Sequence, residues 1–530
     1  MLVASGGWLD VRSGKHLQEA SRALCIDCRK FVGSHLRIVY STPRVLWPLR
    51  PIALERKDKT SRSRATTRIR SRDSSGWAST ATGVSAGEIP PIKVMSITWE
   101  RSLGDLAFGR ALPDGLETLS FSCNFHFYNV EWVSWPSSLM GISFGNEFDQ
   151  AIDTVSWPPS LERLFFGWKF NQSVNGVQWP PGLKQLTFGQ NFDQPIGEVV
   201  WPIGLEDLTF GGRFCQPIRH VVWPPGLRRL TFGWRFNHDV REVTWPPGLK
   251  RLMFGSLFNQ PVDDTMWPQG LEELIFGRVF NQEVGRVAWP TGLRQLALGD
   301  FFNQELNGVV WPPSLEQLSL GNKFNRAVDG VTWPNQLQQL AFGWRFDHPV
   351  HAVSWPANLR QLTFDGGFNQ PVDKVLWPPG LKQLALGQNF NQPICDVLWP
   401  PSLERLDLGD NFNKPVDRVR WPSDLQHLTF GQAFDQPVDE AEWPVRLRRL
   451  SFGGTFNRSL ERVQWPPALE ELAFGREFNQ PVRRVTWPQS LKKLAFGHRF
   501  DQNVNGMEWP EGLREVKLGR ISRPVNVCRR

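Results

Sequence analysis

The feature that most constrains this chain is a Trp-Pro pair that returns every 22 residues. It occurs 18 times with the same step, from Trp135 to Trp509. Numbered from its Trp, each unit follows W-P-x-x-L-x-x-L-x-F-G-x-x-F-N-Q-P-V-x-x-V-x, with Leu at position 5 throughout. A fixed period of this length is typical of repeat architectures, in which each unit is one small structural element. We therefore expect a stacked array and not an ordinary compact enzyme domain.

The pattern inside a unit predicts a short strand. Proline at position 2, often joined by a second proline at position 17, removes backbone donors and leaves little room for a regular helix. Leu at position 8 and Phe or Leu at position 10 alternate with a period of two, as the inward-facing residues of a strand do. Glycine at position 11 then allows a turn. Asn or Asp at position 15 has the chemistry of a turn residue.

A single unit of 22 residues buries too little apolar surface to fold alone, so neighbouring units must stack. Stacking places each residue above its counterpart in the next unit and pairs the short strands in parallel. The sequence thus predicts a β-rich repeat solenoid of about 20 units. We expect internal ladders of Leu, Phe and Trp, and an Asn ladder at the turn.

The ends of the array are irregular and predict capping repeats. Residues 91–134 hold two imperfect units, the first with Trp99, Leu103 and Leu106 at positions 1, 5 and 8. The second carries one extra residue before Trp135. The repeat array proper spans residues 135–519, and residues 520–530 form a C-terminal tail. Degenerate end units are typical of caps, which separate the core from water.

Residues 1–90 differ from the array in charge. The whole chain has a formal net charge of +8, and residues 1–90 alone hold 16 Lys and Arg against 7 Asp and Glu. We expect this segment to be basic and largely disordered. It is either a solvated linker or a tail for nuclear targeting or nucleic-acid contact. The array itself is nearly neutral, which argues against a nucleic-acid groove there.

No pattern in the chain indicates catalysis, a metal site or a bound cofactor. The six Cys are scattered, and Cys25 and Cys28 form a lone CxxC without a second pair of ligands. No apolar run is long enough to span a membrane, and the N-terminus lacks the apolar core of a signal peptide. We therefore predict a non-enzyme in the cytoplasm, while a nuclear or organellar location stays open.

The core of each unit, L-x-x-L-x-F-G-x-x-F-N, resembles the leucine-rich repeat. The blocks FNQPV at 258–262, 368–372 and 478–482, and FNQPI at 390–394, are similar to the FNIP repeat, a branch of that family. The resemblance covers residues 99–519, with Trp at position 1 as its main departure. It implies a right-handed, curved solenoid that serves as a protein-interaction surface and has no catalytic residues.

The outward positions of the strand predict where a protein partner would bind. If positions 8 and 10 face inward, positions 7 and 9 face outward, and position 9 is mostly small, which leaves a shallow groove. Large apolar or basic side chains interrupt this face at Phe165, Met253, Ile275, Arg229 and Arg251.

Position 12 carries Trp in three units, each followed by a cation. The pairs are Trp168 and Lys169, Trp234 and Arg235, and Trp344 and Arg345. An exposed aromatic beside a cation has the composition of an interface hot spot. The alternative is a Trp that folds over the neighbouring turn with the cation stacked on it.

Position 7 is Gln in five successive units, at Gln295, Gln317, Gln339, Gln361 and Gln383. We expect these amides to hydrogen-bond to one another along the stack. The alternative is a polar strip that binds an extended partner.

The leading hypothesis is a non-enzymatic scaffold that binds a protein on the strand face. One alternative is a substrate-recognition adaptor that recruits effectors through residues 1–90. Another is a carbohydrate-binding or adhesion protein that uses the exposed Trp residues. A recently expanded repeat with little selected function is also compatible with the sequence.

Overall fold

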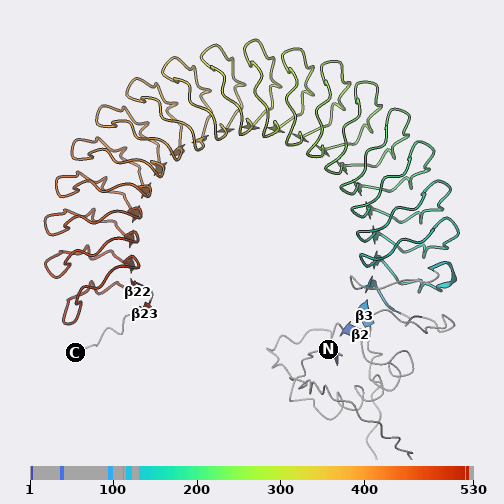
Figure 1. Ribbon diagram of the computed structural model, residues 1–530, viewed down its shortest axis with the longest axis horizontal. Helices are drawn as coiled ribbons and strands as arrows, with labels where there is room; N and C mark the ends of the chain where they lie inside the picture. The colour runs from blue at the N-terminus through green and yellow to red at the C-terminus, as the bar shows by residue number, and fades with distance from the viewer. Residues whose placement is uncertain are drawn as a thin grey trace, which may run out of the picture. The chain divides into compact units, whose positions relative to one another are not determined.

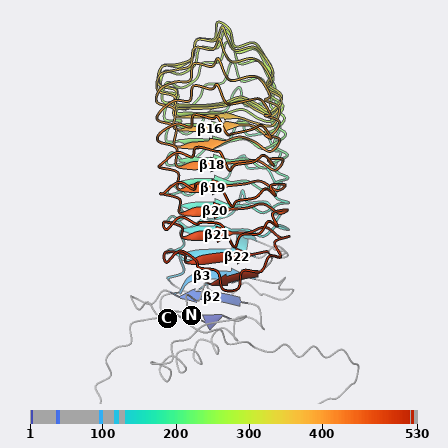
Figure 2. The same cartoon turned by 90° about the vertical axis from the view of Figure 1, so that its left-hand side faces the viewer.

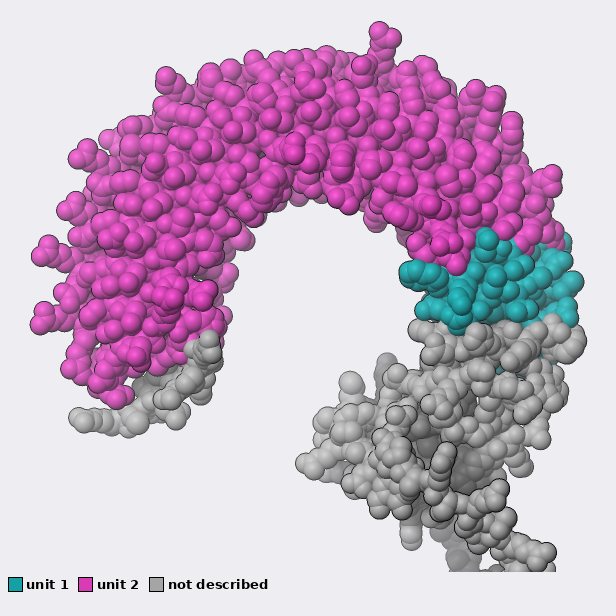
Figure 3. Space-filling view, in the orientation of Figure 1, with its two compact units in different colours: residues 1–172, 177–185 teal, residues 173–176, 186–530 magenta. Residues whose placement is uncertain are grey.

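The computed structural model describes residues 2–3, 36–40, 94–99, 112, 115–121, 130–519 and 521–524. The chain divides into two compact units, residues 1–172 with 177–185, and residues 173–176 with 186–530 (Figure 3). Regular structure in the described part is nearly all strand, and its one helical element is the 3-10 turn η2 (Val130–Trp132).

In the second unit each coil contributes one short strand, and successive strands pair in parallel along the inner edge of the coils (Figures 1 and 2). Leu252 lies opposite Leu274, and Leu274 opposite Leu296, so the register advances by one repeat per strand. The strands are β8 (Asp207–Thr209), β9 (Arg229–Thr231), β10 (Arg251–Met253), β11 (Glu273–Ile275), β12 (Gln295–Ala297), β13 (Gln317–Ser319), β14 (Gln339–Ala341), β15 (Gln361–Phe364), β16 (Gln383–Leu386), β17 (Arg405–Asp407), β18 (His427–Thr429), β19 (Arg449–Ser451), β20 (Glu471–Ala473), β21 (Lys493–Ala495) and β22 (Glu515–Leu518).

These strands occupy positions 7 to 9 of each unit, as the alternation predicted. Leu274 at position 8 is fully buried and Phe276 at position 10 nearly so, whereas the flanking Glu273 and Ile275 are partly exposed. The last parallel strand, β22, pairs with the antiparallel β23 (Ile521–Pro524) in the C-terminal tail. The predicted parallel solenoid is therefore confirmed.

The first unit begins with antiparallel pairing of β1 (Leu2–Val3) with β2 (Leu36–Tyr40), and of β2 with β3 (Val94–Trp99). Parallel pairing then runs from β3 through β4 (Thr118–Phe121) and β5 (Gly141–Ser143) to β6 (Arg163–Phe165). The strand β7 (Gln185–Thr187) lies at the boundary of the two units. Apart from β1 and β2, residues 1–90, for which we expected disorder, lie outside the described residues.

The register that we predicted for the first imperfect unit is wrong. Trp99 lies opposite Phe121, which occupies position 10, and Ile97 lies opposite Leu119 at position 8. The 22-residue step therefore continues one unit towards the N-terminus, but without a Trp at position 1 to mark it. Leu103 and Leu106, which we had placed on the strand side of that unit, lie outside the described residues.

The extra residue predicted before Trp135 is confirmed by the pairing of the next two strands. Leu119 lies opposite Ile142, a step of 23 residues in place of 22. The 3-10 turn η2 falls between these strands and follows the residues that are not described. The cap thus absorbs one insertion without shifting the side chains to the other face of the sheet.

The core between the strands and the outer loops consists of aromatic ladders. Phe280, Phe302 and Phe324 at position 14 are fully buried and stack nearly parallel, with ring centroids 6.3 and 6.1 Å apart. Trp245 at position 1 packs edge-on against Phe232 and Phe254 at position 10. These T-shaped contacts suit the aromatic quadrupoles. They explain how the core accommodates Trp at position 1, which is the main departure from the FNIP-repeat pattern.

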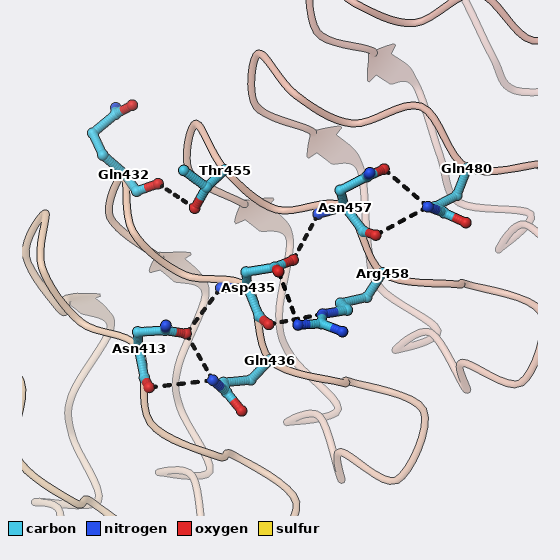
Figure 4. Close-up of polar contacts among 8 residues, drawn as sticks. All are labelled: Asn413, Gln432, Asp435, Gln436, Thr455, Asn457, Arg458 and Gln480. Carbon is cyan, nitrogen blue, oxygen red and sulfur yellow. Dashed lines mark hydrogen bonds and ion pairs between the residues drawn. The ribbon is translucent and has the colours of Figure 1, made fainter.

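The predicted Asn ladder is present and includes the neighbouring Gln. Asn413 Oδ1 accepts hydrogen bonds from the backbone N–H of Asp435, 3.0 Å away, and from Gln436 Nε2, 2.9 Å away (Figure 4). Asp435 in turn accepts from the backbone N–H of Asn457, and Gln480 Nε2 donates to Asn457 (Figure 4). One side chain per coil thus satisfies the backbone donor of the next coil, where no strand is present to do so.

Asn413→Ala is expected to weaken this ladder at one position. The substitution leaves the partly buried N–H of Asp435 without its acceptor, which costs roughly 1–3 kcal/mol. Hydrogen–deuterium exchange should therefore become faster in the peptide that contains Asp435. Asn411→Ala, which removes only a contact with Asn389 on the exposed surface, is the matched control and should leave that exchange unchanged. Equal exchange in both variants would contradict the ladder.

Candidate functional site

The strand face of the second unit carries the side chains at positions 6, 7 and 9. At positions 7 and 9 this face divides into charged segments and one uncharged segment, whereas position 6 carries charged side chains beside the uncharged segment as well, such as Arg294 and Glu316, which pair with each other. In Figure 1 this face lies on the inner edge of the coils. We define the Gln strip as Gln295, Gln317, Gln339, Gln361 and Gln383, at the start of β12 to β16.

On the N-terminal side of the Gln strip the charges are paired with each other. Arg229 Nε lies 2.9 Å from Asp207 Oδ2, and Arg251 Nε lies 3.2 Å from Glu273 Oε2. Lys250 donates a hydrogen bond to Glu272, which lowers the pKa of that carboxyl group. The two arginines that we singled out as partner-binding candidates are thus already engaged within the array.

The C-terminal side of the strand face shows the same arrangement. Glu471 lies 2.7 Å from Arg449 and 3.2 Å from Lys493, so one carboxylate bridges two cations. Partial burial lowers the pKa of His427, and the nearby Arg449 and Arg405 lower it further. Burial and these cations therefore disfavour the charged form of His427.

The Gln strip between the charged segments does not form the ladder that we expected. Among the described residues, none of its five amides hydrogen-bonds to another strip amide or to any other protein group, and each side chain stays partly or fully exposed. The strands that carry these amides are joined through their backbones. The expected ladder of amides is therefore absent among the described residues, and the alternative, a polar strip that binds a partner, stays a prediction.

The residues at position 9 make the floor of the Gln strip shallow. Ala297, Ser319, Ala341 and Thr363 are small, and together with the first four glutamines of the strip they line a groove of about 110 Å³. The glutamine amides rise above this floor and offer both donors and acceptors.

The apolar candidates on this face are half-buried. Met253 and Ile275 lie opposite each other on β10 and β11, so the structure brings these two together. Phe165 lies on β6 in the first unit and is also half-buried.

The three Trp residues at position 12 are exposed, but their surroundings differ. Trp168 is 57% exposed, Trp234 50% and Trp344 46%. Lys169 beside Trp168 pairs with Glu147 of the preceding coil. The Trp344 ring lies over Gly366 of the following coil, in the space that a side chain there would fill. Trp344 is therefore folded over its neighbouring turn, as the second interpretation has it, but among the described residues no cation is stacked on its ring.

Sequence reasoning missed three residues at position 13, next to the Trp positions. Leu257 is 39% exposed, Phe301 is 42% exposed, and Val279 between them is half-buried. Their signal was visible in the sequence, because position 13 is polar, charged or small in the other units of the array.

Within the described residues, no group of His, Cys, Asp and Glu is arranged to hold a metal ion. No helix of that part of the chain has the length and apolar character needed to cross a bilayer.

The comparison with known proteins agrees with the repeat pattern. The FNIP Repeat model matches residues 170–213, 236–279, 368–411 and 396–433. No curated protein sequence matches this chain.

Among solved structures, CroV588, described as a novel circular LRR protein structure, is 36% identical with a TM-score of 0.68. The match covers 77% of this chain and 63% of CroV588, so the chain spans less than two thirds of that protein's length. An internalin, InlF from Listeria monocytogenes, is 14% identical with a TM-score of 0.35, over 62% of this chain and 84% of its own. Segments of this chain therefore match the FNIP Repeat, and its coils form a leucine-rich-repeat-like solenoid, a fold that generally serves protein–protein interaction.

Proposed function

We propose that this chain is a non-enzymatic scaffold that binds a protein partner on its strand face, centred on the Gln strip. The observation that carries the proposal is the contrast along that face. Five amide side chains have no protein partner among the described residues, while Arg229, Arg251 and Glu471 on the charged coils to either side are held in ion pairs.

Because its amides have no protein partner, the Gln strip is the part of this face where binding breaks the fewest existing interactions. A partner over the charged segments would have to displace ion pairs or leave charges desolvated, which is costly. A partner over the Gln strip exchanges water for its own polar groups. The small residues of the floor then allow close approach of the partner's backbone.

An extended or loop segment with uncharged polar side chains suits this surface. Each glutamine offers two donors and a carbonyl acceptor, so it can pair with the backbone N–H and C=O groups of such a segment. Successive strands present these amides at the regular interval of the sheet, about 4.8 Å apart. The surface is thus a repeated set of hydrogen-bonding groups along the stack.

Gln317→Glu/Gln339→Glu/Gln361→Glu is expected to abolish partner capture. Three new carboxylates on adjacent strands repel one another and disfavour uncharged polar groups in the groove, so we expect at least a tenfold loss in recovered partner. Proximity labelling in cells that express the full chain measures the loss, and circular dichroism checks that the variant is folded.

The matched control carries the same added charge on the same coils but off the strand face. Thr332→Glu/Ser354→Glu/Leu376→Glu changes three exposed residues at position 22. This variant should retain the partners of the unmodified chain. Partners lost equally from both variants, or retained by both, would contradict docking on the Gln strip.

A further inference from the structure

A second surface of the array runs along the turns that follow the strands. We define the turn edge as positions 12 and 13 of six successive coils, from Trp234 to Arg345. The backbones of these turns are directly linked, since Leu257 N–H donates to Trp234 C=O at 2.7 Å and Phe301 N–H donates to Arg278 C=O at 2.8 Å. The residues at these positions are therefore neighbours in space, one coil apart.

Four successive coils place an apolar side chain on the turn edge. Trp234, Leu257 and Phe301 are between 39% and 50% exposed, and Val279 between them is half-buried. All four lie within the second unit. They form a continuous apolar row that no other described part of the chain covers. A contiguous exposed apolar row flanked by polar groups is typical of an interaction site.

Cations flank this row, and most of them have no acidic partner. The Phe301 ring lies between the Arg278 guanidinium, 5.8 Å from the ring centroid, and the Lys323 ammonium, 5.6 Å away. Arg278 also lies 3.6 Å from Asp300, the single carboxylate on the edge. Among the described residues, no carboxylate pairs with Arg235, Lys323 or Arg345. On the strand face, by contrast, Arg229, Arg251, Arg449 and Lys493 lie in ion pairs with carboxylates.

We propose that the turn edge binds an acidic peptide segment that carries apolar side chains. Phe301 and Leu257 would contact those side chains. Arg235, Lys323 and Arg345 would pair with the carboxylates on either side. Charge complementarity carries this assignment, because the edge presents cations that the array itself leaves unpaired. An aromatic ring already positioned between two cations costs little entropy to engage.

Two other occupants fit this surface less well. Residues 1–90 of the same chain carry 16 Lys and Arg against 7 Asp and Glu, so the edge would repel them. Single-stranded nucleic acid requires rings for base stacking. Two of the four apolar residues, Leu257 and Val279, are aliphatic. They favour a peptide over a nucleic acid.

The test is selection of binding peptides with the full chain. A library of displayed random 12-residue peptides is panned against the protein, and enriched sequences are synthesised with a fluorophore for anisotropy titration. The proposal expects enrichment of Asp and Glu together with Leu, Phe or Trp, and affinity that falls as salt concentration rises. Phe301→Ala and Lys323→Ala should each weaken binding at least tenfold.

Matched variants separate the turn edge from other surfaces. Val310→Ala removes an apolar side chain that is more exposed and lies off the turn edge, Lys382→Ala removes a cation that is paired with Glu404, and both should leave the affinity within twofold. The triple Gln→Glu variant of the Gln strip should also leave it unchanged, so this proposal and the strand-face proposal can fail separately.

Three outcomes would overturn the assignment. The first is a selection that yields no acidic peptide. The second is selected peptides that bind Leu257→Ala/Phe301→Ala as tightly as the unmodified chain. The third is binding of a 20-nucleotide single-stranded thymidine DNA by the unmodified chain that the same double variant loses, which would assign the edge to nucleic acid.

Discussion

A single methyl group at Gly255 is expected to open the array locally. Gly255 stands at position 11, and a side-chain carbon built on it would overlap the carbonyl oxygen of Gly233 in the preceding coil. Backbone atoms cannot move aside as the end of a flexible side chain does, so Gly255→Ala should cost about 3 kcal/mol or more. Because a long repeat does not unfold in one step, the measurement is hydrogen–deuterium exchange of the peptides that span β9 and β10.

Gly285→Ala is the matched control for this prediction. No atom lies within 4 Å of the side-chain carbon that it would add, so we expect a change within about 0.5 kcal/mol. Unchanged exchange in Gly255→Ala would contradict the prediction, because it would show that neighbouring coils can move apart at position 11 without loss of protection.

The natural exception at position 11 shows what such a change requires. Asp365 follows β15, which extends one residue further than its predecessors, and the next glycine at this position, Gly387, adopts a φ of +77°. The Asp365 carboxylate also accepts a hydrogen bond from the N–H of Gly366. The backbone around Gly255 has none of these adjustments, so a side chain there lacks the space that Asp365 has.

Truncation of the adjacent Phe301 and Phe302 is expected to affect the stability of the array very differently. Phe302 is fully buried between Phe280 and Phe324, so Phe302→Ala should destabilise the array by roughly 3–5 kcal/mol. Phe301 is 42% exposed on the turn edge, so Phe301→Ala should change stability by no more than about 0.5 kcal/mol. Exchange of the peptide that spans both residues, compared across the two variants, gives the local effect.

The pair separates folding from binding. We expect Phe302→Ala to lose protection from exchange in its own and the neighbouring coils, because both ring partners lose a contact. Phe301→Ala should keep that protection and lose only the acidic peptide. Similar loss of protection in the two variants would mean that Phe301 supports the fold and would remove it from the binding surface.

Much of the fold follows from the repeat alone. Leu at position 8 and Phe at position 10 place a strand where β8 to β22 lie, because only that conformation buries both side chains in a short segment. The Asn ladder follows from the same logic, since identical residues become neighbours once the units stack. The need for glycine at position 11 was predicted correctly, but we attributed it to the turn. Most of these glycines do not need positive φ and are instead needed because adjacent coils approach closely.

The surfaces could be predicted only in part. The free amides of the Gln strip contradict the expected ladder, because spacing along the sequence does not tell whether outward side chains turn towards each other. The position of Trp99 in its unit was predicted wrongly because we took every Trp as position 1. The structure instead keeps the 22-residue step between Ile97 and Leu119, which places Trp99 at position 10. Leu257, Val279 and Phe301 were visible as departures from the polar residues of position 13. Their contiguity depends on the hydrogen bonds between successive turns.

Binding of a protein on the strand face, through the Gln strip, can be tested at a single position. A photo-crosslinking amino acid placed at position 339 in the full chain, within cells that express it, tests this most directly. A second chain carries the same amino acid at exposed position 332, off the strand face. The account predicts discrete protein adducts from position 339 and none of the same adducts from position 332. Adducts from position 332 alone, or none from either, would contradict it.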